Sequence, residues 1–397
     1  MKYSTLLENL THLGSEKWSL HYLAREKVAS GTEVIELTIG EPDVPVDESL
    51  IEECYNSMRA GRTRYSNGRG EKNLLDQITN RYNKRNTLKI SNENIVCFPG
   101  TQTALYAAVL SLVEKGGAVA VGDPMYATYE GVIRASGASI TPVPLYLEND
   151  FIMQPRDLEK VLTPNTRVLI LNSPHNPTGS VMSEQDFEKL SALCSDYDLW
   201  VISDEVYEEL IFHGDFFSPR NIADLSKRTI TVSSISKSHA APGFRSGWAI
   251  GPKDFCKKIL PLAETMLFGN QPFIADMTAL ALSKPSKVAA KMRADYFRRA
   301  ELVRKEFRGV PSLKTVMPKA GMFLLVDISQ TGLSCFNFSH KLLQKHNVAV
   351  MPGDSFGAQA KNYIRISLTN PDAILKEACK RISSFVNQTD HTKLNRG

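Results

Sequence analysis

A lysine among hydroxyl side chains is the residue of this chain with the clearest potential for chemistry. Lys237 stands in SSISKSHAAPGFRSGW, with Ser234 and Ser236 before it and Arg245 eight residues after it. A serine-flanked lysine alone is most often a surface residue. Here an apolar strand-like run precedes it, and glycines and a tryptophan follow, which favours a lysine held inside. Such a lysine loses hydration, its pKa falls, and its amine becomes a nucleophile toward an aldehyde.

Two further polar clusters follow apolar, strand-like runs. In LNSPHNPTG, residues 171–179, the run leads to Asn176, and two prolines restrict the loop around it. In LWVISDEVYEEL, residues 199–210, the run ends at Asp204, and Tyr207 follows three positions later. Asp204 can cap a helix start, or it can stay ionised and hold a protonated ring nitrogen with the phenol nearby. The pattern alone leaves both alternatives open.

A fourth element is a helix start that suits an anion. In FPGTQTALYAAVLSL, residues 98–112, Pro99 and Gly100 lead through Thr101 and Gln102 into a helix. Free backbone N–H groups and the helix dipole favour a phosphate at such a position, although many helices open in this way. A dinucleotide fingerprint is excluded, because the glycines of residues 68–70 do not complete GxGxxG and follow no strand.

The elements that must position these groups alternate along the chain between strand and helix. Strands are expected at 34–39, 95–98, 118–121, 139–143, 168–172, 199–203, 229–233 and 246–250, and helices at 48–60, 74–86, 103–112, 126–135 and 183–196. This alternation predicts an α/β fold whose mostly parallel sheet is covered by helices, with ligands at the carboxyl ends of the strands. After Pro285, a charged helix at 286–308, strands at 323–327 and 363–367, and a helix at 372–387 predict a smaller α+β domain.

Composition excludes several classes of protein. The 397 residues are 42% hydrophobic, which is enough for a large core, and 47 Lys and Arg against 43 Asp and Glu leave no basic excess for nucleic acid or acidic membranes. The six cysteines lie tens of residues apart without a CxxC, so we expect reduced core thiols and no metal site. Polar residues interrupt the amino terminus, and no apolar run reaches about 18 residues, so a soluble, cytoplasmic protein is expected.

Taken in chain order, these motifs resemble the class I and II aminotransferases of PLP fold type I. The resemblance rests on NSPHNPTG, SDEVY and SISKSHAAPGFRSGW and covers essentially the whole chain. It implies pyridoxal 5′-phosphate as cofactor and a mostly parallel seven-stranded sheet flanked by helices, with a smaller α+β domain. Residues 1–47 would form an N-terminal segment joining the small domain, 48–285 the large PLP-binding domain, and 286–397 the small C-terminal domain.

The same resemblance assigns roles around the cofactor ring. It makes Lys237 the Schiff-base lysine, which moves a proton between the substrate Cα and the cofactor. Asp204 would pair with the pyridinium nitrogen, Asn176 and Tyr207 would bond the 3′-oxygen, and Tyr126 would stack on the ring. The residues implied to hold the phosphate are Thr101, Gln102, Ser234, Ser236 and Arg245.

Further implied roles concern the substrate and a second subunit. Arg365, in YIRIS, would grip the substrate α-carboxylate through its planar fork, and Gly40 and Asn176 would lie against the same group. Tyr65, in RYSNGRG, would reach the phosphate of the other subunit, which implies a homodimer with shared active sites. The activity implied is a ping-pong transfer of an amino group from an L-amino acid to a 2-oxo acid through pyridoxamine phosphate.

Four segments, NSPHNP, PMYATYE, SKSHA and HYLAREKVASG, are most similar to the sequences of arginine–pyruvate aminotransferases. We therefore expect arginine or another basic amino acid as donor and an acceptor such as pyruvate. Residues 262–275 contain no match to the distal arginine of dicarboxylate-specific members, which disfavours aspartate. Four acids, Glu16, Glu41, Asp43 and Glu264, are possible partners of a cationic side chain, and none is assigned that role. His175 and His239 depart from the commonest pattern and are expected to be hydrogen-bonded supporting residues.

Three alternatives stand beside this hypothesis. An aspartate- or aromatic-type aminotransferase of the same family differs only in its donor, and a PLP C–S β-lyase on the same scaffold would release pyruvate and ammonia from cystathionine without an added 2-oxo acid. The aminotransferase-like effector domain of a transcription regulator would need a DNA-binding domain before it. We do not expect one, because the GEPD segment begins within the first 40 residues.

Overall fold

The computed structural model describes residues 2–4, 6–7, 10 and 17–394. Its larger sheet has seven strands in the order β2-β8-β7-β6-β5-β3-β4, and β8 is antiparallel to both of its neighbours while β3 to β7 pair in parallel. The strands are β2 (Ile95–Phe98), β3 (Ala118–Asp123), β4 (Ser139–Pro144), β5 (Thr166–Asn172), β6 (Trp200–Asp204), β7 (Thr229–Ser234) and β8 (Gly247–Ile250). The predicted mostly parallel seven-stranded sheet is confirmed.

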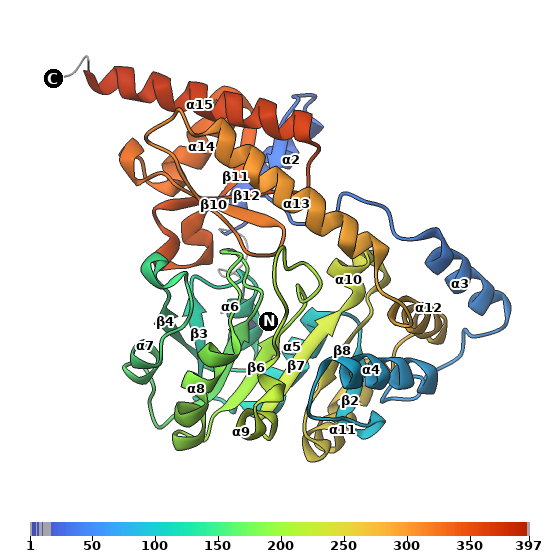
Figure 1. Ribbon diagram of the computed structural model, residues 1–397. Coiled ribbons are helices and arrows are strands. Elements are labelled where there is room, and N and C mark those ends of the chain that lie inside the picture. The colour runs from blue at the N-terminus through green and yellow to red at the C-terminus, as the bar shows by residue number, and fades with distance from the viewer. Residues whose placement is uncertain (1, 5, 8–9, 11–16, 395–397) are drawn as a thin grey trace.

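Helices cover both faces of this sheet, as Figure 1 shows. They are α3 (Glu48–Arg59), α4 (Lys72–Arg85), α5 (Thr101–Leu112), α6 (Tyr129–Ala135), α7 (Pro155–Glu159), α8 (Glu184–Asp196), α9 (Ala223–Ser226), α10 (Ile235–Ser238), α11 (Lys253–Leu267) and α12 (Pro272–Leu282). Alternate residues of β5 point to opposite faces. Val168 and Ile170 join the apolar cluster of α5, whereas Leu169 and Leu171 join that of α8. Burial on both faces explains why the central strands are apolar throughout.

A second sheet has the order β1-β11-β12-β10-β9, and its first strand comes from the start of the chain. Its strands are β1 (Ile35–Leu37), β9 (Lys314–Val316), β10 (Phe323–Asp327), β11 (Val348–Pro352) and β12 (Tyr363–Ser367). β1 pairs in parallel with β11, so two segments far apart in sequence form one sheet. The helices around it are α2 (Ser19–Ala29), α13 (Lys287–Glu306), α14 (Cys335–His346) and α15 (Asp372–Leu394). In Figure 1, α13 runs from this sheet toward α10 beside the larger one.

Several elements differ from the sequence-based expectation. The expected helix at 126–135 begins only at Tyr129, and the one expected from 103 begins at Thr101. The strands β9 and β11 and the helices α11, α12 and α14 were not predicted, and the last helix runs beyond 387 to Leu394. All six cysteines are buried and free, as expected. Among the described residues, no helix has both the length and the apolar character needed to cross a membrane.

Candidate active site

The carboxyl ends of three neighbouring strands build one cavity. In the parallel pairing of β5, β6 and β7, Asn172 lies beside Asp204, and Asp204 lies beside Val232. The polar loops that follow these strands therefore open at the same edge of the sheet. The predicted site residues that line this cavity together are Thr101, Gln102, Tyr126, Asn176, Asp204, Tyr207, Ser234, Ser236, Lys237 and Arg245.

Asp204 is buried and held by two donors. The Tyr129 hydroxyl donates to Asp204 Oδ2 at 2.7 Å, and the backbone amide of Val206 donates to Oδ1 at 3.2 Å. Burial raises the pKa of Asp204 to about 6, while these two hydrogen bonds act in the opposite direction. A cation bound in the cavity would stabilise the ionised form of this buried carboxyl group. The amide contact stabilises the turn at residues 206–209, and because no helix begins there, Asp204 is not the helix cap that the sequence also allowed.

Lys237 lies in the four-residue helix α10, and its amine points toward the segment that follows β1. Its Nζ donates to the carbonyl oxygen of Gly40 at 2.7 Å. Burial, assisted by the charges of Arg365 and Arg245 and opposed by that of Glu41, lowers the pKa of the Lys237 amine to about 8. The neutral amine is thus accessible near physiological pH, which is the form that attacks an aldehyde.

The start of α5 brings hydrogen-bond donors to one end of the cavity. Gly100 precedes the helix with a φ of +85°, and a Cβ there would lie 2.3 Å from Arg245 Nη2. Only glycine lets the guanidinium pack so closely over this turn. The Thr101 hydroxyl is buried without a hydrogen-bond partner in the described structure, and the Ser234 and Ser236 side chains line the same cavity. An arginine, hydroxyls and free helix amides are the donors that suit a phosphate.

Arg365, in the middle of β12, is only 2% exposed. Its Nη1 donates to Asn176 Oδ1 at 3.0 Å and its Nη2 to the carbonyl oxygen of Thr38 at 2.6 Å. Its guanidinium carbon lies 3.7 Å from the ring centre of Phe323 and 4.5 Å from that of Phe356. Burial lowers its pKa to about 9, and its Nε has no partner in the described structure. This group retains hydrogen-bonding capacity for a carboxylate.

Tyr129 is a site residue that the sequence reasoning missed. Besides its hydrogen bond to Asp204, its ring packs edge-on against Tyr126, with centres 5.5 Å apart. In the sequence it reads as one more apolar position of a short helix. Tyr126 precedes α6, and a turn closed by a 3.0 Å hydrogen bond from the Tyr129 amide to the Tyr126 carbonyl oxygen brings the two rings together, so helical spacing gives no signal for this contact.

Tyr65 does not lie in this cavity. It is 89% exposed and lines a surface hollow formed by residues 63–66 and 267–273, where its ring centre is 5.8 Å from that of Phe268. Within one chain, therefore, Tyr65 is separate from the other predicted site residues.

The two unusual histidines are buried and hydrogen-bonded. His175 Nδ1 lies 2.7 Å from the hydroxyl oxygen of Thr178, and His239 Nε2 lies 3.1 Å from the carbonyl oxygen of Ala281. Burial lowers the pKa of each imidazole to about 4, so both are neutral at physiological pH. These contacts fit supporting residues.

The candidate acids that the structure describes lie outside the lining of this cavity. Glu16 lies outside the described residues, and Glu41, Asp43 and Glu264 are not part of the cavity lining. Within the part of the chain that the structure describes, no group of three or more His, Cys, Asp or Glu side chains is arranged to hold a metal ion.

Known proteins resemble this chain in both sequence and structure. Residues 32–382 match the family model described as aminotransferase class I and II. The chain is 40% identical to the arginine–pyruvate transaminase of Pseudomonas aeruginosa, over 96% of this chain and 98% of that protein. It is 31% identical to the aspartate aminotransferase of Pyrococcus horikoshii, over 90% and 92% of the two chains. A solved double mutant of Thermus thermophilus aspartate aminotransferase superimposes with a TM-score of 0.91 at 27% identity, covering 97% and 99%.

Proposed function

This chain belongs to the class I and II aminotransferases, and we propose that it moves the amino group of arginine, or of another basic amino acid, to a 2-oxo acid such as pyruvate. That it is a pyridoxal-phosphate-dependent aminotransferase of fold type I follows from the family and from the solved structures that it matches. The observation that carries the proposed donor is the 40% identity to an arginine–pyruvate transaminase, against 31% to an aspartate aminotransferase.

The cavity suits the cofactor at each of its polar ends. The helix start at Thr101, with Arg245 and the hydroxyls of Ser234 and Ser236, would hold the phosphate. Asp204 would hold the ring nitrogen in its protonated state, supported by the hydrogen bond from Tyr129. The remaining proposed contacts are those of Asn176 and Tyr207 with the 3′-oxygen, of Tyr126 with the ring face, and of Gln102 with the phosphate.

When bound, pyridoxal phosphate supplies a conjugated ring that accepts the electron pair left when a bond to the substrate Cα breaks. The protein must then bind the substrate and move one proton. Arg365 would orient the substrate by its α-carboxylate, with Asn176 and the backbone of Gly40 beside it. Lys237, with its lowered pKa, would take the proton from the substrate Cα and deliver it to the cofactor.

The amino donor can be identified by a half-reaction in the absence of any acceptor. We expect arginine to convert the bound cofactor to its amine form at least about tenfold faster than aspartate or phenylalanine. Aspartate is disfavoured because residues 262–275 contain no basic side chain to pair with a second carboxylate, and arginine is favoured over phenylalanine by the 40% identity to an arginine–pyruvate transaminase. The measurement is the change of cofactor absorbance with each donor, followed by its recovery on adding pyruvate or 2-oxoglutarate.

Faster conversion by aspartate or phenylalanine would contradict the arginine proposal and leave the family assignment intact. Release of pyruvate and ammonia from cystathionine, with no acceptor present, would select the C–S β-lyase alternative instead. Lysine in the same panel distinguishes a donor pocket for any cation from one that requires a guanidinium.

We further propose a homodimer in which Tyr65 reaches the phosphate site of the partner subunit. Its support is the nearly complete exposure of Tyr65 and the exposed Phe268 beside it, which leaves an aromatic patch uncovered on one chain. Sedimentation equilibrium is expected to give twice the 44.1 kDa of one chain. We expect Tyr65→Phe to weaken cofactor retention several-fold without changing that mass, since one hydroxyl is lost from the phosphate site. A monomer that retains the cofactor would contradict both statements.

The division at residues 47 and 285 stays a proposal, and it is supported by the pairing of β1 with β11 in the smaller sheet. The cytoplasmic location expected from the sequence stays a prediction.

A further inference from the structure

A short segment between β1 and α3 contacts two cationic side chains of the site, Lys237 and Arg365. The carbonyl oxygen of Thr38 accepts a hydrogen bond from Arg365, and that of Gly40 accepts one from Lys237. Residues 38–43 belong to no helix or strand. Since no ladder of backbone hydrogen bonds fixes this segment, side-chain contacts must keep its two carbonyl oxygens in place.

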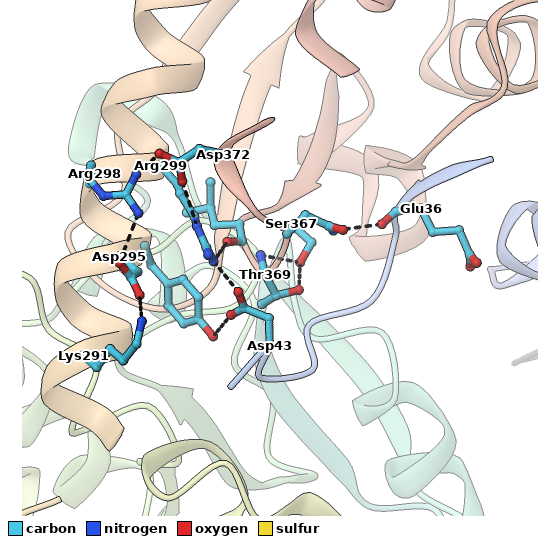
Figure 2. Close-up of polar contacts among 12 residues, drawn as sticks. Glu36, Asp43, Lys291, Asp295, Arg298, Arg299, Ser367, Thr369 and Asp372 are labelled. Carbon is cyan, nitrogen blue, oxygen red and sulfur yellow. Dashed lines mark hydrogen bonds and ion pairs between the residues drawn. The ribbon is translucent and has the colours of Figure 1, made fainter. Parts of the chain in front are cut away.

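Asp43, at the far end of the segment, supplies such a contact. Its Oδ2 lies 2.8 Å from Arg299 Nη1, and its Oδ1 accepts a hydrogen bond of 3.2 Å from the Tyr296 hydroxyl. Both partners come from α13, and Figure 2 shows Asp43 and Arg299 pointing toward one another. The side chains of Asp43 and Arg299 are 17% and 8% exposed, so water screens this pair less than a surface ion pair.

Arg299 also ties the strand that carries Arg365. Its Nη1 donates to the carbonyl oxygen of Leu368 at 2.9 Å, and Leu368 follows directly after β12. One guanidinium thus binds the segment through Asp43 and the end of β12 through Leu368. The hydrogen bond from Arg365 to the carbonyl oxygen of Thr38 joins the same two parts of the chain, the segment after β1 and the strand β12.

The packing around Gly40 leaves little room for the segment to move. A Cβ on Gly40 would lie 2.1 Å from the ring of Phe323, so the backbone is pressed against that ring. The same ring also packs against the guanidinium of Arg365, whose central carbon lies 3.7 Å from the ring centre. A shift of residues 38–40 would therefore disturb Arg365 both through Thr38 and through Phe323.

We propose that Asp43 and Arg299 are a positioning pair, which holds the backbone of residues 38–40 against Arg365 and Lys237 and thereby sets the affinity for the substrate α-carboxylate. The inference rests on the proposed function, because it takes Arg365 to be the carboxylate-binding group.

Steady-state kinetics of Asp43→Asn and Arg299→Lys test this role. Each substitution weakens the contact between residue 43 and residue 299 but leaves the cavity lining intact. We therefore expect KM for every amino donor to rise about tenfold while kcat changes by less than about threefold. Arg304→Gln is the matched control, because Arg304 is another arginine of α13 and pairs with Glu301, so this variant is expected to keep the wild-type KM.

Hydrogen exchange of the backbone amides of residues 38–41, measured without substrate, gives a second readout. We expect faster exchange in Asp43→Asn and Arg299→Lys and no change in Arg304→Gln. An unchanged KM in a variant that melts like the wild type overturns the proposal, whatever the exchange rate. If Asp43→Asn does not fold, Arg299→Lys keeps a charge at the site and carries the test. Absence of amino transfer in the wild type would instead refute the proposed function, and the exchange result would still decide whether the pair holds the segment.

Discussion

Replacing Lys237 with alanine is expected to abolish amino transfer and the covalent attachment of the cofactor together. The amine is the group that both attacks the cofactor aldehyde and carries the Cα proton, so the rate should fall by at least about a thousandfold. Borohydride reduction followed by peptide mass mapping should find the cofactor on the peptide containing residue 237 in the wild type, and on no peptide of the variant. Lys227→Ala, which removes an exposed lysine paired with Asp224, is the control expected to behave as the wild type.

The Lys237→Ala result can be separated from misfolding. Burial lowers the pKa of this amine from 10.5 to about 8, so the folded state binds the proton less tightly than the unfolded state. The resulting cost to folding is fully present below about pH 8 and disappears as the pH rises through 10.5. Because the variant lacks this buried cation, we expect it to melt no lower than the wild type at pH 7 when both proteins are free of cofactor. A borohydride-stable adduct elsewhere in the variant would contradict the assignment of Lys237.

The sheet explains why most of the site could be predicted from the sequence. Asn176, Asp204 and Lys237 each follow an apolar run, and parallel strands place such loops at one edge. Tyr129 could not be recognised in this way, since its role is a hydrogen bond to a strand end 75 residues away. The contact of Asp43 with Tyr296 spans 253 residues and depends on how the start of the chain packs against α13.

Three of the elements that were not predicted, α12, α11 and β9, lack a clear sequence signal or contain one that interrupts it. α12 is buried over most of its surface, so it shows no alternation of polar and apolar positions. α11 contains Pro261, which usually marks the end of a helix. β9 has three residues and lies at the edge of the smaller sheet, where burial imposes little pattern.

Arg365→Lys is expected to lower kcat/KM for the preferred donor by about 100- to 1,000-fold, mostly through KM. Lysine keeps the charge but cannot donate to Asn176 and the carbonyl oxygen of Thr38 at once while also binding a carboxylate through a planar fork. Truncating one partner of a buried, hydrogen-bonded charge pair costs about 2–5 kcal/mol, which corresponds to this range. Arg304→Lys, an exposed arginine paired with Glu301, serves as the control.

Comparison of arginine with agmatine, which is arginine without its carboxyl group, isolates the interaction that Arg365 is proposed to make. The wild type should strongly prefer arginine, because agmatine leaves the buried guanidinium of Arg365 without an anion. In Arg365→Lys the ratio of kcat/KM for arginine to that for agmatine should fall by about the same factor as kcat/KM for arginine. Both substrates present the same distal group, so only the carboxylate contact differs between them. If another amino acid proves to be the donor, it and its decarboxylated amine replace this pair. A preference that stays unchanged while kcat/KM falls equally for both compounds would mean that Arg365 supports the fold of the cavity and does not bind the carboxylate.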